Sequence, residues 1–173
     1  MLIVLAGLPG AGKSTLAKSL QVALHVELVS RDAVRMAEFP RWDEHAAKRA
    51  AFEVVRLEVS VMLRAGASVI VDGATLSTAK ERAVLRRLAT DFEHEFVLMW
   101  LTLPAELAAE RIAADPHEAP KDRMPSLAAV VAQRFEPPSI DEQAVVLDAT
   151  QDRAHVLASA LEALRARAQE PRP

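Results

Sequence analysis

The chain has 173 residues, of which 51% are apolar and 26% charged, and its formal net charge is −3. This length fits one folded domain of about 100–200 residues, and the composition excludes a disordered or fibrous chain. Because there is no cysteine, disulfides, thiolate metal ligands and thiol nucleophiles are excluded too. The slight acidic excess disfavours a long nucleic acid as partner, while short or mononucleotide ligands stay open.

Short apolar runs alternate with longer amphipathic stretches along the chain, which is typical of a parallel sheet with crossover helices. The longest early apolar run, 2–6, is far shorter than the ~20 residues of a membrane span, and no basic segment precedes it. We therefore expect no membrane span, no targeting segment and a cytoplasmic location. The predicted strands are 2–6, 26–29, 68–71, 95–101 and 144–147.

Local signals predict several helix ends. Gly66 suits a left-handed C-cap, Thr78 and Glu81 have the spacing of a capping box, and Ser126 is a candidate N-cap. The first predicted helix follows a glycine-rich loop, the second spans 44–64 and the third begins at 78–81. A fourth helix follows the fourth strand, a fifth spans 126–135, and the last packs apolar residues between 156 and 164.

The clearest motif follows the first strand and satisfies G-x-x-x-x-G-K-[ST]. Its glycines allow backbone N–H groups to converge on phosphate oxygens, while the next helix directs its positive end at the same anion. Lys13 is expected to bind the β- and γ-phosphates of a nucleoside triphosphate, and Ser14 to ligate Mg²⁺. The alternative is a strand-to-helix turn without function. The predicted nucleotide-binding residues are Gly7, Leu8, Pro9, Gly10, Ala11, Gly12, Lys13, Ser14 and Thr15.

The same loop serves several classes of protein, and the rest of the sequence narrows the choice. The chain is too short for the added helical domain of large ring ATPases. It also contains neither the Asn-Lys-x-Asp guanine motif nor the Ser-Gly-Gly-Gln signature of transporter ATPases. A small phosphotransferase is therefore favoured.

Two acidic residues follow predicted strands, at the sheet edge where ligands gather in open parallel sheets. Asp32 is a candidate general base for an acceptor hydroxyl, and Arg35 is a candidate to hold the acceptor or the developing phosphate charge. Alternatively, Asp32 only caps a helix and Arg35 is solvated. Asp72 ends a buried strand and is a candidate Mg²⁺ ligand, or else a carboxylate bonded to loop amides.

This combination resembles the small P-loop kinase superfamily, which includes polynucleotide 5′-kinase domains, zeta-toxin-like kinases and chloramphenicol phosphotransferase-like enzymes. Residues 7–15 are similar to their ATP loop, and Arg31-Asp32-x-x-Arg35 resembles the polynucleotide kinase branch, in which the aspartate is the general base and the arginine contacts the acceptor. Residues 69–76 resemble the third-strand motif without its usual Asn. The resemblance covers most of the chain and implies an α/β, three-layer P-loop fold with a five-stranded parallel sheet in the order 2-3-1-4-5.

The resemblance also implies a lid, at about 111–136, whose arginines neutralise the transferred phosphate. Arg123 is our first candidate because it lies in the irregular segment 115–125. Arg111 is the second and is alternatively an adenine-stacking residue, while Arg134 completes the set. The alternative for each of the three is an exposed surface arginine with no part in the reaction.

The function predicted from these observations is an ATP- and Mg²⁺-dependent kinase, in one domain over 1–173, that phosphorylates a hydroxyl of a small-molecule or nucleotide-like acceptor. The alternatives are a polynucleotide 5′-hydroxyl kinase and an ATP-binding interaction module that phosphorylates no acceptor. The acceptor and the oligomeric state stay open.

Weaker features receive structural interpretations. Arg41 and Trp42 are candidates to line an acceptor pocket. The alternative for Trp42 is that it covers the edge of the core or the start of the long helix. Trp100 is expected in the core, and the histidines show no metal-ligand spacing. The basic residues of the helix after 78, namely Lys80, Arg82, Arg86 and Arg87, predict a solvated face rather than a nucleic-acid footprint.

Overall fold

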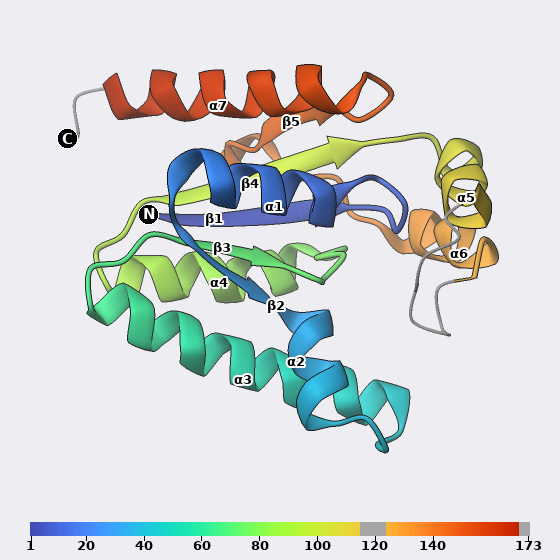
Figure 1. Cartoon of the computed structure of the whole chain (residues 1–173), viewed down its shortest axis with the longest axis horizontal. Helices are drawn as coiled ribbons and strands as arrows, with labels where there is room; N and C mark the ends of the chain where they lie inside the picture. Colours follow the sequence, from blue (N-terminus) through green and yellow to red (C-terminus); the bar gives the residue numbers. More distant parts are fainter. Residues whose placement is uncertain (115–123, 170–173) are drawn as a thin grey trace.

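A five-stranded parallel sheet lies at the centre of the computed structural model, which describes residues 1–114 and 124–169. Its strand order, β2-β3-β1-β4-β5, is the predicted one. Helices α1 and α7 cover one face of the sheet and α3 and α4 the other, which gives three layers (Figure 1). In chain order the elements are β1 (Leu2–Gly7), α1 (Lys13–Leu24), β2 (Glu27–Ser30), α2 (Arg31–Glu38), α3 (Glu44–Arg64), β3 (Val69–Asp72), α4 (Ala79–Asp91), β4 (Phe96–Thr102), α5 (Ala105–Ala114), α6 (Ser126–Arg134), the 3₁₀ helix η1 (Ile140–Glu142), β5 (Val145–Asp148) and α7 (Arg153–Gln169).

The central strand β1 is buried along its whole length. Its alternate side chains enter two different cores: Ile3 belongs to the cluster that contains residues of α1 and α7, and Val4 belongs to the cluster that contains residues of α3 and α4. A strand covered on both faces needs apolar residues at every position, which explains why its sequence shows no alternation. No helix in the described part of the chain is long and apolar enough to cross a membrane.

Most of the predicted helix ends are confirmed. Gly66 has φ +81°, and the amides of Gly66 and Ala67 donate to the carbonyls of Leu63 (2.8 Å) and Met62 (3.0 Å), which is a Schellman cap. The capping box at the start of α4 is also present.

The predicted Ser126 cap is wrong. Pro125 is the N-cap and already has helical angles, φ −51° and ψ −38°, and no side-chain hydrogen bond caps the helix. Ser126 is therefore inside the first turn, one position too late for its hydroxyl to serve as the cap. Trp100 is partly buried on β4, where its ring stacks on that of Phe135 with centroids 6.1 Å apart.

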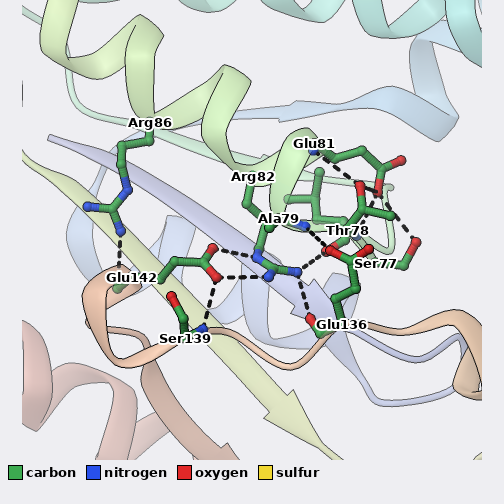
Figure 2. A network of polar contacts seen from close by, with 10 residues as sticks. Ser77, Thr78, Ala79, Glu81, Arg82, Arg86, Glu136, Ser139 and Glu142 are labelled. Atoms are coloured by element: carbon green, nitrogen blue, oxygen red, sulfur yellow. Dashed lines mark hydrogen bonds and ion pairs between the residues drawn. The ribbon is translucent and has the colours of Figure 1, made fainter.

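The structure also contradicts the predicted solvated face for two residues. Arg86 is partly buried, and its guanidinium lies over the ring of Phe96. Arg82 is 1% exposed. Its Nε and Nη2 donate to the two carboxylate oxygens of Glu142, at 2.6 and 2.8 Å, while Nη1 donates to the carbonyls of Leu76 and Glu136, both at 3.0 Å (Figure 2). Arg82 precedes Leu85 by three residues on the buried side of α4, which is why it faces inward. Lys80 and Arg87 are exposed, as predicted.

This ion pair makes the stability of the fold sensitive to acid. The hydrogen bonds from Arg82 lower the pKa of the Glu142 carboxyl below its ordinary value. A lowered folded-state pKa stabilises the protein fully above the unfolded value, and this stabilisation is lost as the pH falls through the folded value. We expect the Tm difference between the wild type and Glu142→Gln to be largest above about pH 5 and to shrink toward pH 3. A difference that grows on acidification, measured by thermal unfolding at each pH, would contradict this.

Candidate active site

The loop between β1 and α1 forms an open cradle at the carboxyl end of the central strand. Gly12 is the N-cap of α1 and has no side chain with which to cap the first amides of the helix. Gly10, with φ +83°, packs so closely on α5 that a Cβ atom would lie 2.6 Å from the carbonyl oxygen of Ala108. The absence of a side chain at Gly12 leaves the N-terminus of α1 accessible to an anion. The absence of one at Gly10 allows the loop to pack against α5.

Lys13 places its ammonium group within this loop. The side chain is buried, and Nζ donates to the carbonyls of Gly7 (2.9 Å) and Leu8 (2.8 Å). Ser14 and Thr15 follow on the first turn of α1. The lysine charge is thus held beside the amides that would bind phosphate, where a charged donor has its greatest effect.

A cavity of about 1400 Å³ lies in front of this loop. This exceeds the about 300–1,000 Å³ of a typical small-molecule site, so two ligands can be accommodated side by side. Of the predicted nucleotide-binding residues, Gly7 and Leu8 do not line the cavity, and they contribute the carbonyls that hold Lys13 instead. The predicted residues that do line it are Pro9 through Thr15, Asp32, Arg35, Asp72, Arg111 and Arg134.

Asp72 is the last residue of β3 and pairs in register with Ser30 of β2. Its side chain is 4% exposed, and Oδ1 is buried without a hydrogen-bond partner among the described residues. The alternative of a carboxylate bonded to loop amides therefore fails for this oxygen. A buried carboxylate oxygen is costly unless a cation or donor meets it, and Mg²⁺ prefers such hard oxygen ligands. Together with the Ser14 hydroxyl in the same cavity, Asp72 fits a magnesium site.

Asp32 lies in the first turn of α2, at the same edge of the sheet as Asp72. The capping alternative for Asp32 is wrong, because Ser30 is the N-cap and its Oγ accepts from the amide of Ala33 at 3.4 Å. The half-buried Asp32 carboxylate lines the cavity and lies 3.7 Å from Nη2 of Arg31. Arg35, one turn further along α2, lines the same cavity.

Gly73 brings the ends of β2 and β3 together. It has φ +80°, and a Cβ atom there would lie 2.6 Å from the amide nitrogen of Asp32 and 2.9 Å from that of Arg31. Both contacts are with backbone, which cannot give way without moving the first turn of α2. The position of Asp32 therefore depends on the absence of a side chain at Gly73.

A pair of glycine variants tests this dependence. Gly66 has nearly the same φ, +81°, but a Cβ atom there would meet nothing within 4 Å. Gly66→Ala and Gly73→Ala therefore share the backbone strain of a left-handed alanine, and only Gly73→Ala displaces Asp32. We expect Gly73→Ala to lose at least about tenfold more kcat than Gly66→Ala in steady-state kinetics, because small displacements of reacting groups are costly. Equal kcat values at equal stability would contradict this.

The predicted lid arginines divide into two groups. Arg111, near the end of α5, and Arg134, the last residue of α6, both line the cavity. Arg123, our first choice, lies outside the described residues, so its assignment stays a prediction. The described part of the chain therefore offers Arg111 and Arg134 as cations that approach the cavity from the side of α5 and α6.

The opposite side of the cavity contains residues that sequence reasoning missed. The first turns of α3 contribute His45, Lys48, Arg49 and Phe52, and α2 adds Arg31. Lys48 pairs with Glu44 on its own helix. The topology of the fold could have indicated these residues. Since α3 returns from the carboxyl edge of the sheet, its first turns must lie at that edge. We call Arg31, Arg35, Lys48 and Arg49 the cationic wall.

Arg41 and Trp42 do not line this cavity. Trp42 is 57% exposed, so it does not cover the core edge. It borders a small hollow with Ala46 and Ala50 of α3, which fits the alternative that it covers the start of the long helix. Its ring packs edge-on against Phe39, with centroids 4.9 Å apart, in the turn that leads from α2 into α3. The amide of Trp42 also donates to the carbonyl of Phe39, at 3.3 Å, within this turn.

A family model described as an AAA domain matches residues 2–138, which is most of the chain. The chain belongs to this AAA domain family. No curated protein is similar enough to the sequence of this AAA domain to count as a match.

Solved structures share the fold over nearly the whole chain. A gluconokinase from Sinorhizobium meliloti 1021 has 21% identity and a TM-score of 0.71, covering 96% of this chain and 93% of that one. A sugar kinase from Janibacter sp. HTCC2649 has 23% identity and a TM-score of 0.72, covering 95% and 94%. A shikimate kinase from Bacteroides thetaiotaomicron has 18% identity and a TM-score of 0.66, covering 97% and 98%. These likenesses confirm the predicted small P-loop kinase fold of this AAA domain.

Proposed function

We propose that this AAA domain is an ATP-dependent phosphotransferase that moves the γ-phosphate to a hydroxyl of a small-molecule acceptor. The observation that carries the proposal is that Lys13, Asp72 and Asp32 line one cavity at the carboxyl edge of the sheet. A phosphate cradle, a buried carboxylate suited to a metal and a half-buried carboxylate suited to a base are the parts that phosphoryl transfer needs. Support also comes from the names gluconokinase, sugar kinase and shikimate kinase carried by structures of the same fold.

The nucleotide would be held by the loop. The amides at the start of α1 and the Lys13 ammonium bind the phosphates, and Ser14 and Asp72 provide oxygen ligands for Mg²⁺. Bound there, Mg²⁺ supplies positive charge that offsets the charge of the phosphates. Asp72 is buried, and one of its carboxylate oxygens has no hydrogen-bond partner among the described residues, which leaves that oxygen available to a cation.

Asp32 would accept the proton of the acceptor hydroxyl. As that oxygen forms its bond to the γ-phosphorus, the bond from the γ-phosphorus to the bridging oxygen of the β-phosphate breaks and ADP leaves. The proton ends on the Asp32 carboxylate, and Arg35 lies one turn away to hold the acceptor. Arg111 and Arg134, with Arg123 as predicted, provide candidates for neutralising the transferred group.

The cationic wall favours an acceptor that also carries a negative group, such as a hydroxy acid or a nucleotide. Four positive side chains of the wall face the cavity on the side of Asp32, and arginine is well suited to bind carboxylate or phosphate. The same observation keeps a polynucleotide 5′-hydroxyl as a second candidate, because its phosphates would meet the same cations.

A panel of acceptors tests the proposal. The wild-type protein is incubated with ATP, Mg²⁺ and one acceptor at a time, chosen from gluconate, shikimate, neutral sugars, 3′-mononucleotides and short oligonucleotides. Phosphorus NMR then detects any new phosphate ester together with ADP. We expect an ester with an anionic small molecule, and rates with an oligonucleotide should fall steeply with salt if several phosphates are bound. ATP binding without an ester from any class of hydroxyl would favour the interaction module.

A further inference from the structure

The Arg82 network consists of Arg82, Glu142, Glu136, Leu76 and Ser77, and it joins two stretches of the chain, 76–82 and 136–142, that are distant in sequence (Figure 2). Arg82 lies on α4, Glu142 on η1 before β5, and Glu136 just after α6. The two latter residues are separated from Arg82 by 60 and 54 positions. One buried guanidinium therefore ties the connection between α6 and β5 to the loop that follows β3.

Both tied segments reach the cavity. Leu76 and Ser77 line it, and the amide of Glu136 donates to the carbonyl of Ser77 at 2.8 Å. One residue earlier, the carbonyl of Thr75 accepts from the amide of Gly7, at 3.1 Å, where the phosphate loop begins. On the other segment, Arg134 lies two residues before Glu136 and lines the cavity as well.

We propose that Arg82 is a positioning residue for phosphoryl transfer, which holds the loop 75–78 and the end of α6 in place around the acceptor. The proposal rests on the proposed kinase function. Arg82 itself does not line the cavity, so it acts through Leu76 and Glu136 rather than on substrate. A planar guanidinium can bind a carboxylate with two donors while a third reaches carbonyls, and neither lysine nor an apolar residue reproduces this geometry.

Positioning can be separated from stability with a variant that removes both charges of the pair, because a buried ion pair often contributes little net stability. Replacing both partners with apolar residues of similar size is frequently neutral or stabilising, whereas removing one partner is damaging. The test variant is therefore Arg82→Met combined with Glu142→Leu. It leaves no unpaired buried charge, but it removes the donor to the carbonyls of Leu76 and Glu136 and the carboxylate that accepts from the amide of Ser139. The control is Arg87→Met on the same helix, whose side chain is 84% exposed.

Three measurements are made on each variant: thermal unfolding, hydrogen exchange of residues 75–78, and kinetics with the acceptor found for the wild type. In the double variant we expect a folded protein with a Tm modestly below that of the control, because two carbonyls lose their donor. We also expect faster exchange at 75–78, and kcat/KM for the acceptor lower by about 10- to 100-fold. The dissociation constant of a nonhydrolysable ATP analogue should change by less than about threefold. The reason is that Lys13 keeps its hydrogen bonds to the phosphate loop in this variant. Arg82→Lys with Glu142 intact should recover only part of the acceptor kcat/KM.

Either of two results would overturn the proposal. One is wild-type kcat/KM for the acceptor in a folded double variant; the other is a parallel loss of Tm, analogue affinity and kcat/KM, which is the pattern of a structural role alone. The kinase proposal fails separately, if the wild type phosphorylates no acceptor. In that case hydrogen exchange still decides about Arg82, since unchanged exchange at 75–78 would contradict its positioning of that loop.

Discussion

Replacing Lys13 with methionine should lower kcat by about 10²–10³, because the ammonium is a preorganised donor for charge that develops on the γ-phosphate. Methionine nearly matches the length of the lysine side chain, so the buried position stays filled. The carbonyls of Gly7 and Leu8 lose their donor, and some loss of loop order should follow. Initial rates at saturating ATP and acceptor measure the effect.

The matched control for this variant is Lys18→Met, on the same helix with its side chain exposed. It removes the same charge from α1 without touching the loop. We expect rates close to wild type for Lys18→Met. If both variants kept full activity, the phosphate loop would have no part in the reaction.

Replacing Asp32 with asparagine should lower kcat by about 10²–10⁴ while ATP affinity changes little, because asparagine cannot accept the proton of the acceptor hydroxyl. The substitution keeps the shape of the side chain at the start of α2, where Ser30 provides the cap and Asp32 is not needed for it. The fall should therefore appear in kcat without a comparable change in the Kd of the nucleotide.

Glu38→Gln is the control for Asp32→Asn. Glu38 is exposed at the other end of α2 and does not line the cavity. It should keep the wild-type kcat. An Asp32→Asn variant that matches this control in pre-steady-state transfer would exclude Asp32 as the base and leave the acceptor hydroxyl to be deprotonated by other means.

The sequence sufficed for those parts of the fold that local patterns determine. The apolar run of β1 and the glycine-rich loop lie next to each other in the chain, so their spacing predicts the phosphate cradle directly. Asp32 and Asp72 could be placed at one edge because parallel strands end there, and the register Ser30–Asp72 confirms the placement. The order of the strands came from the resemblance, since no local pattern specifies it.

Long-range pairing was beyond the sequence. The buried position of Arg82 depends on its ion pair with Glu142, which is 60 positions away. No local sequence pattern links these two residues. Apolar spacing from Leu85 to Ala89 nevertheless places Arg82 on the buried stripe of α4, and this clue outweighs its charge. Lys48 and Arg49 of the cationic wall were missed for a similar reason, because they have the pattern of ordinary surface residues of a helix until the start of α3 is placed beside α2.

Calorimetric titration with a nonhydrolysable ATP analogue in the presence of Mg²⁺ tests the central claim most directly, since every later step requires an occupied phosphate loop. The account predicts saturable binding at one site of the wild-type chain, and binding that is much weaker in Lys13→Met. Absence of saturable binding to the folded wild-type protein, at any concentration of Mg²⁺, would contradict it.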